Sequence, residues 1–442
     1  MSEAAYRALY RLGCRLRRTP VLERLEDLEK SQWRTAAAQR EHQIEMLGRL
    51  LAHARDRSPF YRGLFERHGI DPAATVSLDD LRAIPPVGKR DLAAASADVQ
   101  NEGLGRGLVR SGTSGSTGEP LVFYRDRDWD AGHRAAVLRG CRWYGVEPWM
   151  RSGLLWGMAG DRRRRRRTRL EDAMQNRFRA RRFDLSGPTL DAFIRRLAGA
   201  RMLEGYSSMV YEAARRVNES RSGGARLRLL LVKGTSERIY PHYRSECLRA
   251  FGRTMTSEYG AAEAGIIAFE CPEGTMHVNT DHVIVEEVGG EIVVTNLLSY
   301  SFPFIRYRLG DHVVLRDHVR CACGREGPAV EEIAGRVGGV ILGAGGRRFP
   351  ALTHYYVIKE LARSGDLLVR CQARQREKGR LEYLVVLRQG AGDARRAEFE
   401  ESLREAARRQ YGRDIEAVVE FVDGIRDEGA KQSDFVSFIP DS

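Results

Sequence analysis

Apolar residues recur every three to four positions in several stretches of this 442-residue chain. Such spacing places them on one face of an α-helix and therefore predicts amphipathic helices. Besides residues 129–144 and 190–197, the spacing occurs in the N-terminal quarter at Ile44, Leu47, Leu50 and Leu51. We expect residues 1–100 to form a helical lead-in.

Short continuous apolar runs lie between these helices, at residues 154–156 and at Leu229–Val232. Runs of this length predict buried parallel strands. Strands that alternate with helices indicate an α/β sheet, in which loops at the carboxyl ends of the strands carry the ligands. Gly234–Glu237 and Ser257–Glu263 are the two loops predicted there.

The chain then turns to a β-type pattern. Two runs of β-branched residues, at 283–286 and 291–294, flank Gly289-Gly290, which predicts a hairpin in a β-rich subdomain. Six glycines crowd residues 335–346, a density typical of a hinge or linker.

Beyond that hinge the pattern predicts strands at 367–372, 381–387 and 418–422 and a helix at 398–411. The fold class predicted from these patterns is α/β. A large N-terminal domain (1–335) holds mixed α/β sheets and the β-rich subdomain, and its nucleotide- and acid-binding core is residues 101–335. A small mobile α+β domain (336–442) follows.

The composition indicates in which compartment the protein resides and which class of partner it binds. The chain has no apolar run of bilayer length and no secretory leader pattern, and its seven cysteines are an odd number, so we expect a cytoplasmic protein without a membrane partner. The net charge of +13 favours anionic partners. Arg162–Arg167 is predicted to be a solvated loop, with a dock for CoA phosphates or an acidic carrier protein as the alternative.

The segment from Ser111 to Pro120 consists almost entirely of Gly, Ser and Thr between two short β-type runs. A strand–loop–strand unit of this composition offers backbone N–H and hydroxyl donors to a polyphosphate. It lacks the Gly-Lys-Ser/Thr of a P-loop. A flexible linker is the alternative. The candidate phosphate ligands are Ser111, Thr113, Ser114, Gly115, Ser116, Thr117 and Gly118.

Four soft ligands form a second candidate site: Cys271, His277, Cys321 and Cys323. Three thiolates and one imidazole suit a tetrahedral structural Zn²⁺. The spacing is not that of a standard finger, His318 competes with His277, and ordinary free thiols are the alternative.

Thr113–Pro120 resembles the phosphate loop of the adenylate-forming superfamily, in the version of its phenylacetate–CoA ligase branch. Four later segments resemble that family's elements in the same order: Tyr259-Gly260-x-x-Glu263, Tyr307-Arg308-x-Gly310-Asp311, Gly335-Arg336 and the tail around Lys431. Two departures stand out. Glu119 replaces a lysine in the loop, and Gly338-Gly339 replaces the acidic hinge pair.

The resemblance implies that Glu263 binds Mg²⁺, that Asp311 binds the ribose, and that Lys431 contacts the reacting carboxylate. Lys431 and Glu263 are thereby the catalytic candidates. The family's Cys-x-Cys-Gly-Arg segment also supports zinc. Further candidates for ATP contact are Gly234, Thr235, Ser236, Glu237, Glu258, Tyr259, Gly260, Arg325 and Arg336.

Three functions follow from this sequence. The first is an ATP-dependent, AMP-forming ligase that converts an aryl or related small acid to an acyl-adenylate and transfers the acyl group to CoA. The second passes the acyl group to a carrier protein or an amine. The third is a nucleotide- or nucleic-acid-binding protein without catalysis, although no specific nucleic-acid motif is present. The oligomeric state stays open, with a homodimer as one option.

Overall fold

The computed structural model describes residues 1–75, 77–101, 107–113, 121–156, 162–180, 187–220, 227–336, 340–362, 367–388, 390–426 and 434–439. It divides into two compact units, each considered by itself here. Unit 1 comprises 1–309 and 314–332, and unit 2 comprises 310–313 and 333–442. The sequence placed the boundary at 335/336.

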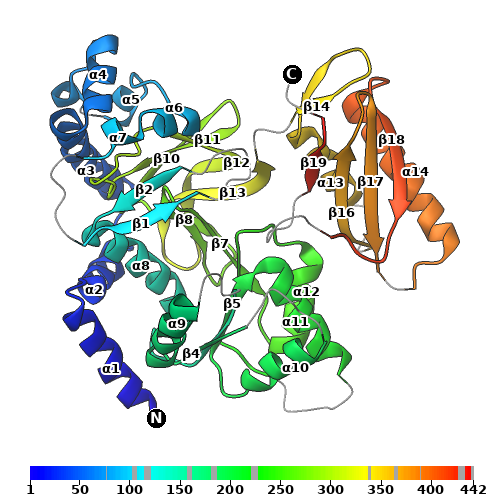
Figure 1. Cartoon of the computed structure of the whole chain (residues 1–442), viewed down its shortest axis with the longest axis horizontal. Coiled ribbons are helices and arrows are strands. Elements are labelled where there is room, and N and C mark those ends of the chain that lie inside the picture. The colour runs from blue at the N-terminus through cyan, green and yellow to red at the C-terminus, as the bar shows by residue number, and fades with distance from the viewer. Residues whose placement is uncertain are drawn as a thin grey trace. The chain divides into compact units, whose positions relative to one another are not determined.

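Unit 1 begins with the predicted helical lead-in (Figure 1). Its described helices are α1 (Glu3–Leu16), α2 (Val21–Ser31), α3 (Ala36–Arg57), α4 (Pro59–His68), η1 (Pro72–Ala74), α5 (Leu78–Leu81), α6 (Lys89–Ala94) and α7 (Ser96–Val99). The apolar spacing in α3 forms the predicted buried face of the helix, since Leu47, Leu50 and Leu51 are fully buried.

A hairpin of β1 (Val109–Gly112) and β2 (Val122–Arg125) follows, with Ser111 paired to Phe123. It confirms the predicted strand–loop–strand unit. Thr113 closes the base of the loop, because its N–H donates to the Leu121 carbonyl and its Oγ1 accepts from Leu121 N, both at 3.0 Å. Asp126 then caps α8 (Arg127–Arg142) by accepting a hydrogen bond from Trp129 N.

The described strands of unit 1 beyond the hairpin join an 11-stranded sheet in the order β10-β11-β12-β13-β9-β8-β7-β6-β5-β3-β4. Its parallel part is β3 (Ser152–Leu155), β4 (Arg177–Arg179), β5 (Met202–Tyr206), β6 (Leu231–Thr235) and β7 (Met255–Ala261). The β-rich part is β8 (Gly265–Glu270), β9 (Met276–Val278), β10 (Val283–Val288), β11 (Glu291–Asn296), β12 (Tyr307–Arg320) and β13 (Glu326–Arg336).

The crossover helices of the parallel part are α9 (Arg162–Met174), α10 (Gly187–Arg196), α11 (Ser207–Glu219) and α12 (Pro241–Phe251). α11 and α12 cover one core of the sheet, built around Leu203, Val232 and Met255. The prediction of a loop at Arg162–Arg167 is wrong, because these residues begin α9. Arginine is a good helix former, and this propensity outweighs the repulsion between neighbouring like charges.

The β-rich part confirms the predicted hairpin, with β10 and β11 paired from Val283–Asn296 to Val288–Glu291. Gly289 and Gly290 have φ of 63° and 81°. Two successive positive φ values match the turn that tight hairpins favour, so glycine is needed at both positions.

Unit 2 has the predicted α+β composition. Its elements are β14 (Val340–Leu342), β15 (Arg348–Pro350), α13 (Leu352–Ala362), β16 (Leu368–Gln375), β17 (Arg380–Leu387), α14 (Asp393–Tyr411), β18 (Glu416–Phe421) and β19 (Phe435–Ser437). The four-stranded sheet runs β18-β17-β16-β19, and the two helices share a core with it. Part of the predicted hinge is ordered structure, since β14 and β15 form a hairpin.

None of the helices in the described ranges is long and apolar enough to cross a membrane.

Candidate functional site

Three parallel strands of unit 1 end side by side and bring the predicted loops together. Tyr206 at the end of β5 pairs with Thr235 of β6, and Thr235 pairs with Glu258 of β7. Thr235 Oγ1 lies 3.5 Å from the Glu258 carbonyl. The segments predicted as loops, 234–237 and 257–263, therefore meet at the carboxyl edge of the sheet, where α/β folds bind ligands. The loop prediction was too long, since Gly234 and Thr235 end β6 and 257–261 belong to β7.

Glu237 fixes the loop after β6 to the start of α11. Its Oε2 accepts hydrogen bonds from Ser208 N at 2.9 Å and Ser208 Oγ at 2.7 Å, while Ser207 Oγ donates to the Glu237 carbonyl at 3.1 Å. The carboxylate thus satisfies an N–H group in the first turn of α11. The N-cap residue of α11 is Tyr206, whose side chain makes no capping hydrogen bond.

The backbone of this loop is strained at Ser236, whose φ is +66°. Non-glycine residues rarely adopt such values, and they do so most often at functional sites. Gly234 leaves no room for a side chain, since a Cβ there would lie 2.6 Å from Met255 Sδ and 2.7 Å from Ser207 Oγ. The loop is therefore held in one conformation by its neighbours.

A buried cation, Lys233, comes directly before this loop in β6. Lys233 Nζ is 2.9 Å from Glu204 Oε2 on β5 and 2.7 Å from Glu258 Oε2 on β7. Burial alone would lower the pKa of Lys233, but the two carboxylates raise it above its ordinary value. The sequence analysis missed Lys233 and Glu204, although a lysine after four apolar residues is itself a signal of a buried ion pair.

Glu263 occupies the tight turn between β7 and β8. The turn needs Gly260, because a Cβ there would lie 2.5 Å from the Gly265 carbonyl oxygen. The Glu263 side chain is buried, Oε1 accepts a hydrogen bond from Tyr307 Oη at 3.1 Å, and its backbone carbonyl accepts one from Asn296 Nδ2 at 2.7 Å. The carboxylate is thus held in a fixed orientation by β11 and β12.

Packed aromatic rings connect this carboxylate to the β1–β2 hairpin. Phe123 of β2 contacts Phe304 edge-to-face with a centroid distance of 5.0 Å, and Phe304 contacts Tyr307 at 5.1 Å. Phe123 is fully buried. The base of the predicted phosphate loop and the predicted metal ligand Glu263 are therefore joined through two rings.

For the remaining nucleotide candidates, the structure gives the position in a strand but fewer contacts to the residues described above. Strand alternation puts Tyr259 on the opposite face of β7 from Glu258, and its side chain is 8% exposed. Asp311 follows Gly310 in β12, where Gly310 has a φ of 81°. The backbone of Arg336 ends β13. Ser114–Gly118 and Lys431 lie outside the described residues.

The four candidate zinc ligands come together at the other end of β8 from Glu263. The ligand atoms of Cys271, His277, Cys321 and Cys323 all lie within 4.8 Å of one another. Cys271 Sγ is 3.7 Å from Cys321 Sγ, and Cys323 Sγ is 3.3 Å from His277 Nε2. A tetrahedral site with Zn–S bonds of about 2.3 Å places its sulfur atoms about 3.8 Å apart, close to this separation. Within the described ranges, His277 and not His318 joins the cluster.

Two turns of the same geometry present the thiols. Gly274 N donates to the Cys271 carbonyl at 2.9 Å, and Gly324 N donates to the Cys321 carbonyl at 3.0 Å. Both glycines have positive φ, of 80° and 85°. Burial acts to raise the pKa of Cys321, but hydrogen bonds from Thr275 and Cys323 outweigh it and lower the pKa below its ordinary value, which favours the metal-binding thiolate.

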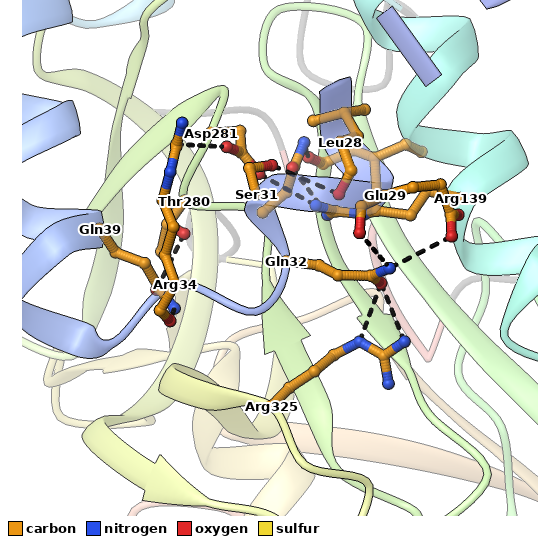
Figure 2. A network of polar contacts seen from close by, with 12 residues as sticks. Leu28, Glu29, Ser31, Gln32, Arg34, Gln39, Arg139, Thr280, Asp281 and Arg325 are labelled. Carbon is orange, nitrogen blue, oxygen red and sulfur yellow. Dashed lines mark hydrogen bonds and ion pairs between the residues drawn. The ribbon is translucent and has the colours of Figure 1, made fainter. Parts of the chain in front are cut away.

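Arg325, predicted to contact ATP, belongs to this end of the unit. Its guanidinium lies over the rings of Trp33 (4.6 Å) and Trp143 (4.2 Å) and donates to Gln32 Oε1. Figure 2 shows Gln32 and Arg325 in a polar network with the lead-in helices. We therefore leave Arg325 out of the nucleotide site proposed below.

The same network fastens the lead-in to the sheet. Asp281 accepts hydrogen bonds from Arg34 (3.2 Å) and Arg139 (3.0 Å), and Gln39 bonds Thr280 and the Glu326 carbonyl (Figure 2). The Cys321–Gly324 turn lies next to the end of α2, because a Cβ at Gly324 would be 3.3 Å from the Trp33 ring.

No known protein-family profile matches the chain. Protein CapK of Staphylococcus aureus is 20% identical over 289 residues, which cover 63% of this chain and 64% of that protein. The match thus spans less than two thirds of that relative's length.

Solved structures of 2-hydroxyisobutyryl-CoA ligase are similar over nearly the whole chain. In the postadenylation state with 2-HIB-AMP, the TM-score is 0.72 at 19% identity, covering 92% of this chain and 91% of that one. An open conformation with 2-HIB-AMP and CoA gives 0.60 at 19% identity, covering 91% and 92%. At such identities the likeness establishes the fold alone, and the chain has the mixed α/β fold of that ligase.

Proposed function

We propose that this protein is an ATP-dependent, AMP-forming ligase that activates a carboxylic acid as an acyl-adenylate and then transfers the acyl group to a thiol. The observation that carries this proposal is the ring-to-ring connection from the base of the β1–β2 loop to the Glu263 carboxylate. Thr113 at the base of the loop and the Glu263 carboxylate belong to one packed assembly, which supports a triphosphate site between them.

In the first half-reaction the substrate carboxylate attacks the α-phosphorus of ATP, the bond to the bridging oxygen breaks, and pyrophosphate leaves. Ser111, Thr113 and the loop to Gly118 donate to the β- and γ-phosphates, and Glu263 provides a carboxylate oxygen for Mg²⁺. Bound Mg²⁺ would neutralise phosphate charge as the bond breaks. Gly234–Glu237, Glu258, Tyr259 and Gly260 line the base and acyl pockets, Asp311 accepts from the ribose hydroxyls, and Arg336 contacts the nucleotide.

Lys431 of unit 2 is proposed to donate to the reacting carboxylate and stabilise the negative charge of the transition state. In the second half-reaction a thiol attacks the acyl carbon and AMP leaves. CoA is the proposed acceptor, supported by the CoA complex of the similar ligase. A carrier-protein thiol or an amine is the alternative that the experiment below separates.

An aryl or related small acid is the proposed substrate class. Trp156 follows β3 and Tyr206 ends β5, and their rings stack with a centroid distance of 4.6 Å and an angle of 22°. Because Tyr206 is buried and covers one face of the Trp156 ring, the other face of the partly buried Trp156 is the proposed flat apolar wall for an aromatic substrate.

The test is to trap acyl-adenylate with hydroxylamine while ATP is present and a panel of aryl, short aliphatic and amino acids is offered. We expect hydroxamate from aryl acids, and its loss in Lys431→Ala. Repeating the assay with CoA in place of hydroxylamine should yield the thioester. Hydroxamate without thioester would favour the carrier-protein or amine alternative. Failure of every acid to give hydroxamate while ATP still binds would contradict the proposed reaction.

We further propose that Cys271, His277, Cys321 and Cys323 hold one structural Zn²⁺. The donor set, the closeness of its four ligand atoms and the paired glycine turns fit this metal. A closed four-ligand site leaves no position for substrate, so the metal would fix the cysteine turns against the lead-in helices.

Cys323→Ser is expected to lower the zinc content from one equivalent to well below one, which elemental analysis measures. It should also loosen the Arg325–Trp143 contact and thereby lower the thermal midpoint of unfolding. Cys371→Ser is the matched control, since Cys371 is buried in the core of unit 2. Wild-type protein that is purified without chelators and contains no zinc would contradict this assignment.

A further inference from the structure

Helix α1 carries two exposed rows of side chains that run along its axis. Residues four apart lie on one face of a helix. The apolar row is Ala8, Leu12 and Leu16, and the basic row beside it is Arg11 and Arg15, followed just beyond the end of the helix by Arg18, whose φ is 51°. All six residues are exposed, and the leucines are 51% and 75% exposed. These six residues are called the α1 surface below.

The other side of α1 attaches the helix to unit 1. Tyr10 packs edge-to-face on Trp149 with a centroid distance of 6.4 Å, and Arg17 is 4.0 Å from Glu171 of α9. Burial raises the pKa of Tyr10 to about 12. The apolar row therefore lies on the solvent side of α1, away from the face on which Tyr10 packs. In Figure 1, α1 lies at the edge of unit 1.

The arginines of the α1 surface have no partners among the described residues. None of Arg11, Arg15 and Arg18 forms an ion pair there. Neighbouring α9 adds further residues of the same kinds, with Arg166 and Arg169 exposed and Leu170 63% exposed. The three arginines line a hollow that is also lined by four acidic residues, Glu23 and Glu26 of α2 together with Asp126 and Asp128.

A row of leucines beside a row of unpaired arginines matches one kind of partner. At an anionic lipid surface the leucines enter the boundary of the acyl chains while the arginines reach the phosphates. A second copy of this chain would bring two arginine rows together, and a nucleic acid would leave the leucine row in water. The net charge of +13 adds long-range attraction of the same sign.

We propose that the α1 surface binds the interface of anionic phospholipid membranes, with α1 lying in the plane of the membrane. The proposal departs from the expectation from the sequence that the protein has no membrane partner. It is consistent with the finding that no described helix can span a bilayer. It does not depend on the proposed ligase activity.

Co-sedimentation of the full-length protein with vesicles tests the proposal. Vesicles of phosphatidylserine and phosphatidylcholine should bind the wild type, and vesicles of phosphatidylcholine alone should bind it far less. Each arginine near an anionic surface contributes about a fivefold increase in binding, so Arg11→Gln/Arg15→Gln/Arg18→Gln should weaken it on the order of 100-fold. Leu12→Gln/Leu16→Gln should also abolish sedimentation.

The matched control removes three exposed arginines of α14, as Arg395→Gln/Arg404→Gln/Arg408→Gln, and should keep binding near the wild-type level. Unchanged far-ultraviolet circular dichroism shows that each variant is folded, because the changed side chains face solvent. Three results would overturn the proposal: no binding of the wild type at low salt, an equal loss in the α14 control, or normal binding of the leucine variant. Lipid-independent self-association that the leucine variant abolishes would show that a second copy covers the surface, and would also overturn it.

Discussion

Lys233→Ala is expected to lower the free energy of unfolding by about 3–5 kcal/mol, because it leaves two carboxylates that are only 18% and 10% exposed without their shared counter-charge. Glu204 and Glu258 both lie within 3 Å of the ammonium, whose side chain is 4% exposed. Chemical denaturation followed by circular dichroism measures the loss.

The control is an exposed pair of similar length. Arg216 Nε is 2.9 Å from Asp191 Oδ1, with side chains 44% and 36% exposed, so Arg216→Ala should cost less than about 1 kcal/mol. Glu204→Gln added to Lys233→Ala should recover part of the lost stability, because one of the two uncompensated charges is removed. Lys233→Ala within about 1 kcal/mol of the wild type would contradict the account of this buried pair.

The pH dependence of this contribution follows from the shifted pKa values. Burial acts to raise the pKa of Glu204, but Lys233 lowers it below the ordinary 4.5. The carboxylate therefore stabilises the fold above pH 4.5, and this is lost as the pH falls through the folded pKa. The raised pKa of Lys233 adds stability that is present below 10.5 and lost as the pH rises above the folded pKa.

Glu263→Gln is expected to lower the rate of acyl-adenylate formation by about 10²–10³-fold, because a neutral amide is a poor ligand for Mg²⁺ and leaves phosphate charge uncompensated. The amide oxygen can still accept the hydrogen bond from Tyr307, so stability should change little. Hydroxamate formation at several Mg²⁺ concentrations, together with the thermal midpoint, separates the two effects.

Glu273→Gln is the matched control, since Glu273 is exposed and lies in the turn after β8. It should keep the wild-type rate. Glu263→Asp should retain some activity with a higher Mg²⁺ requirement. A Glu263→Gln variant that adenylates within a factor of about three of the wild type would remove this residue from the proposed metal site.

Much of the fold could be predicted because local patterns and tertiary structure agree. The Gly289-Gly290 hairpin and the helix at 129–144 formed at nearly the predicted positions, and the strand predicted at Leu229–Val232 formed two to three residues later, as β6. In all three, the periodicity or turn chemistry determines the element with little help from distant residues.

The failures have a different cause. Arg162–Arg167 looked like a loop because like charges repel, whereas the structure has the start of α9. The packing of the Arg325 guanidinium over the rings of Trp33 and Trp143, residues about 290 and 180 positions away, was also not predicted. Contacts of that separation have no local signal in one sequence.

The sequence motifs of the candidate site were predictable, but the residues that orient their side chains were not. Glu263 and Glu237 belong to short recognisable segments, whereas Tyr307, Asn296 and Ser208, which orient them, come from other elements. Only the register of β5, β6 and β7 reveals that Glu204, Lys233 and Glu258 meet.

The most direct test of the central claim is exchange of labelled pyrophosphate into ATP in the absence of CoA. The proposed mechanism makes adenylation reversible and independent of the thiol, so exchange should require both Mg²⁺ and a carboxylic acid, and the acid that gives hydroxamate should also support exchange. Adding the thiol should then convert the acyl-adenylate to the thioester and release AMP. Exchange that is absent with every acid that the protein binds, or that proceeds equally well without any acid, would contradict the proposed function.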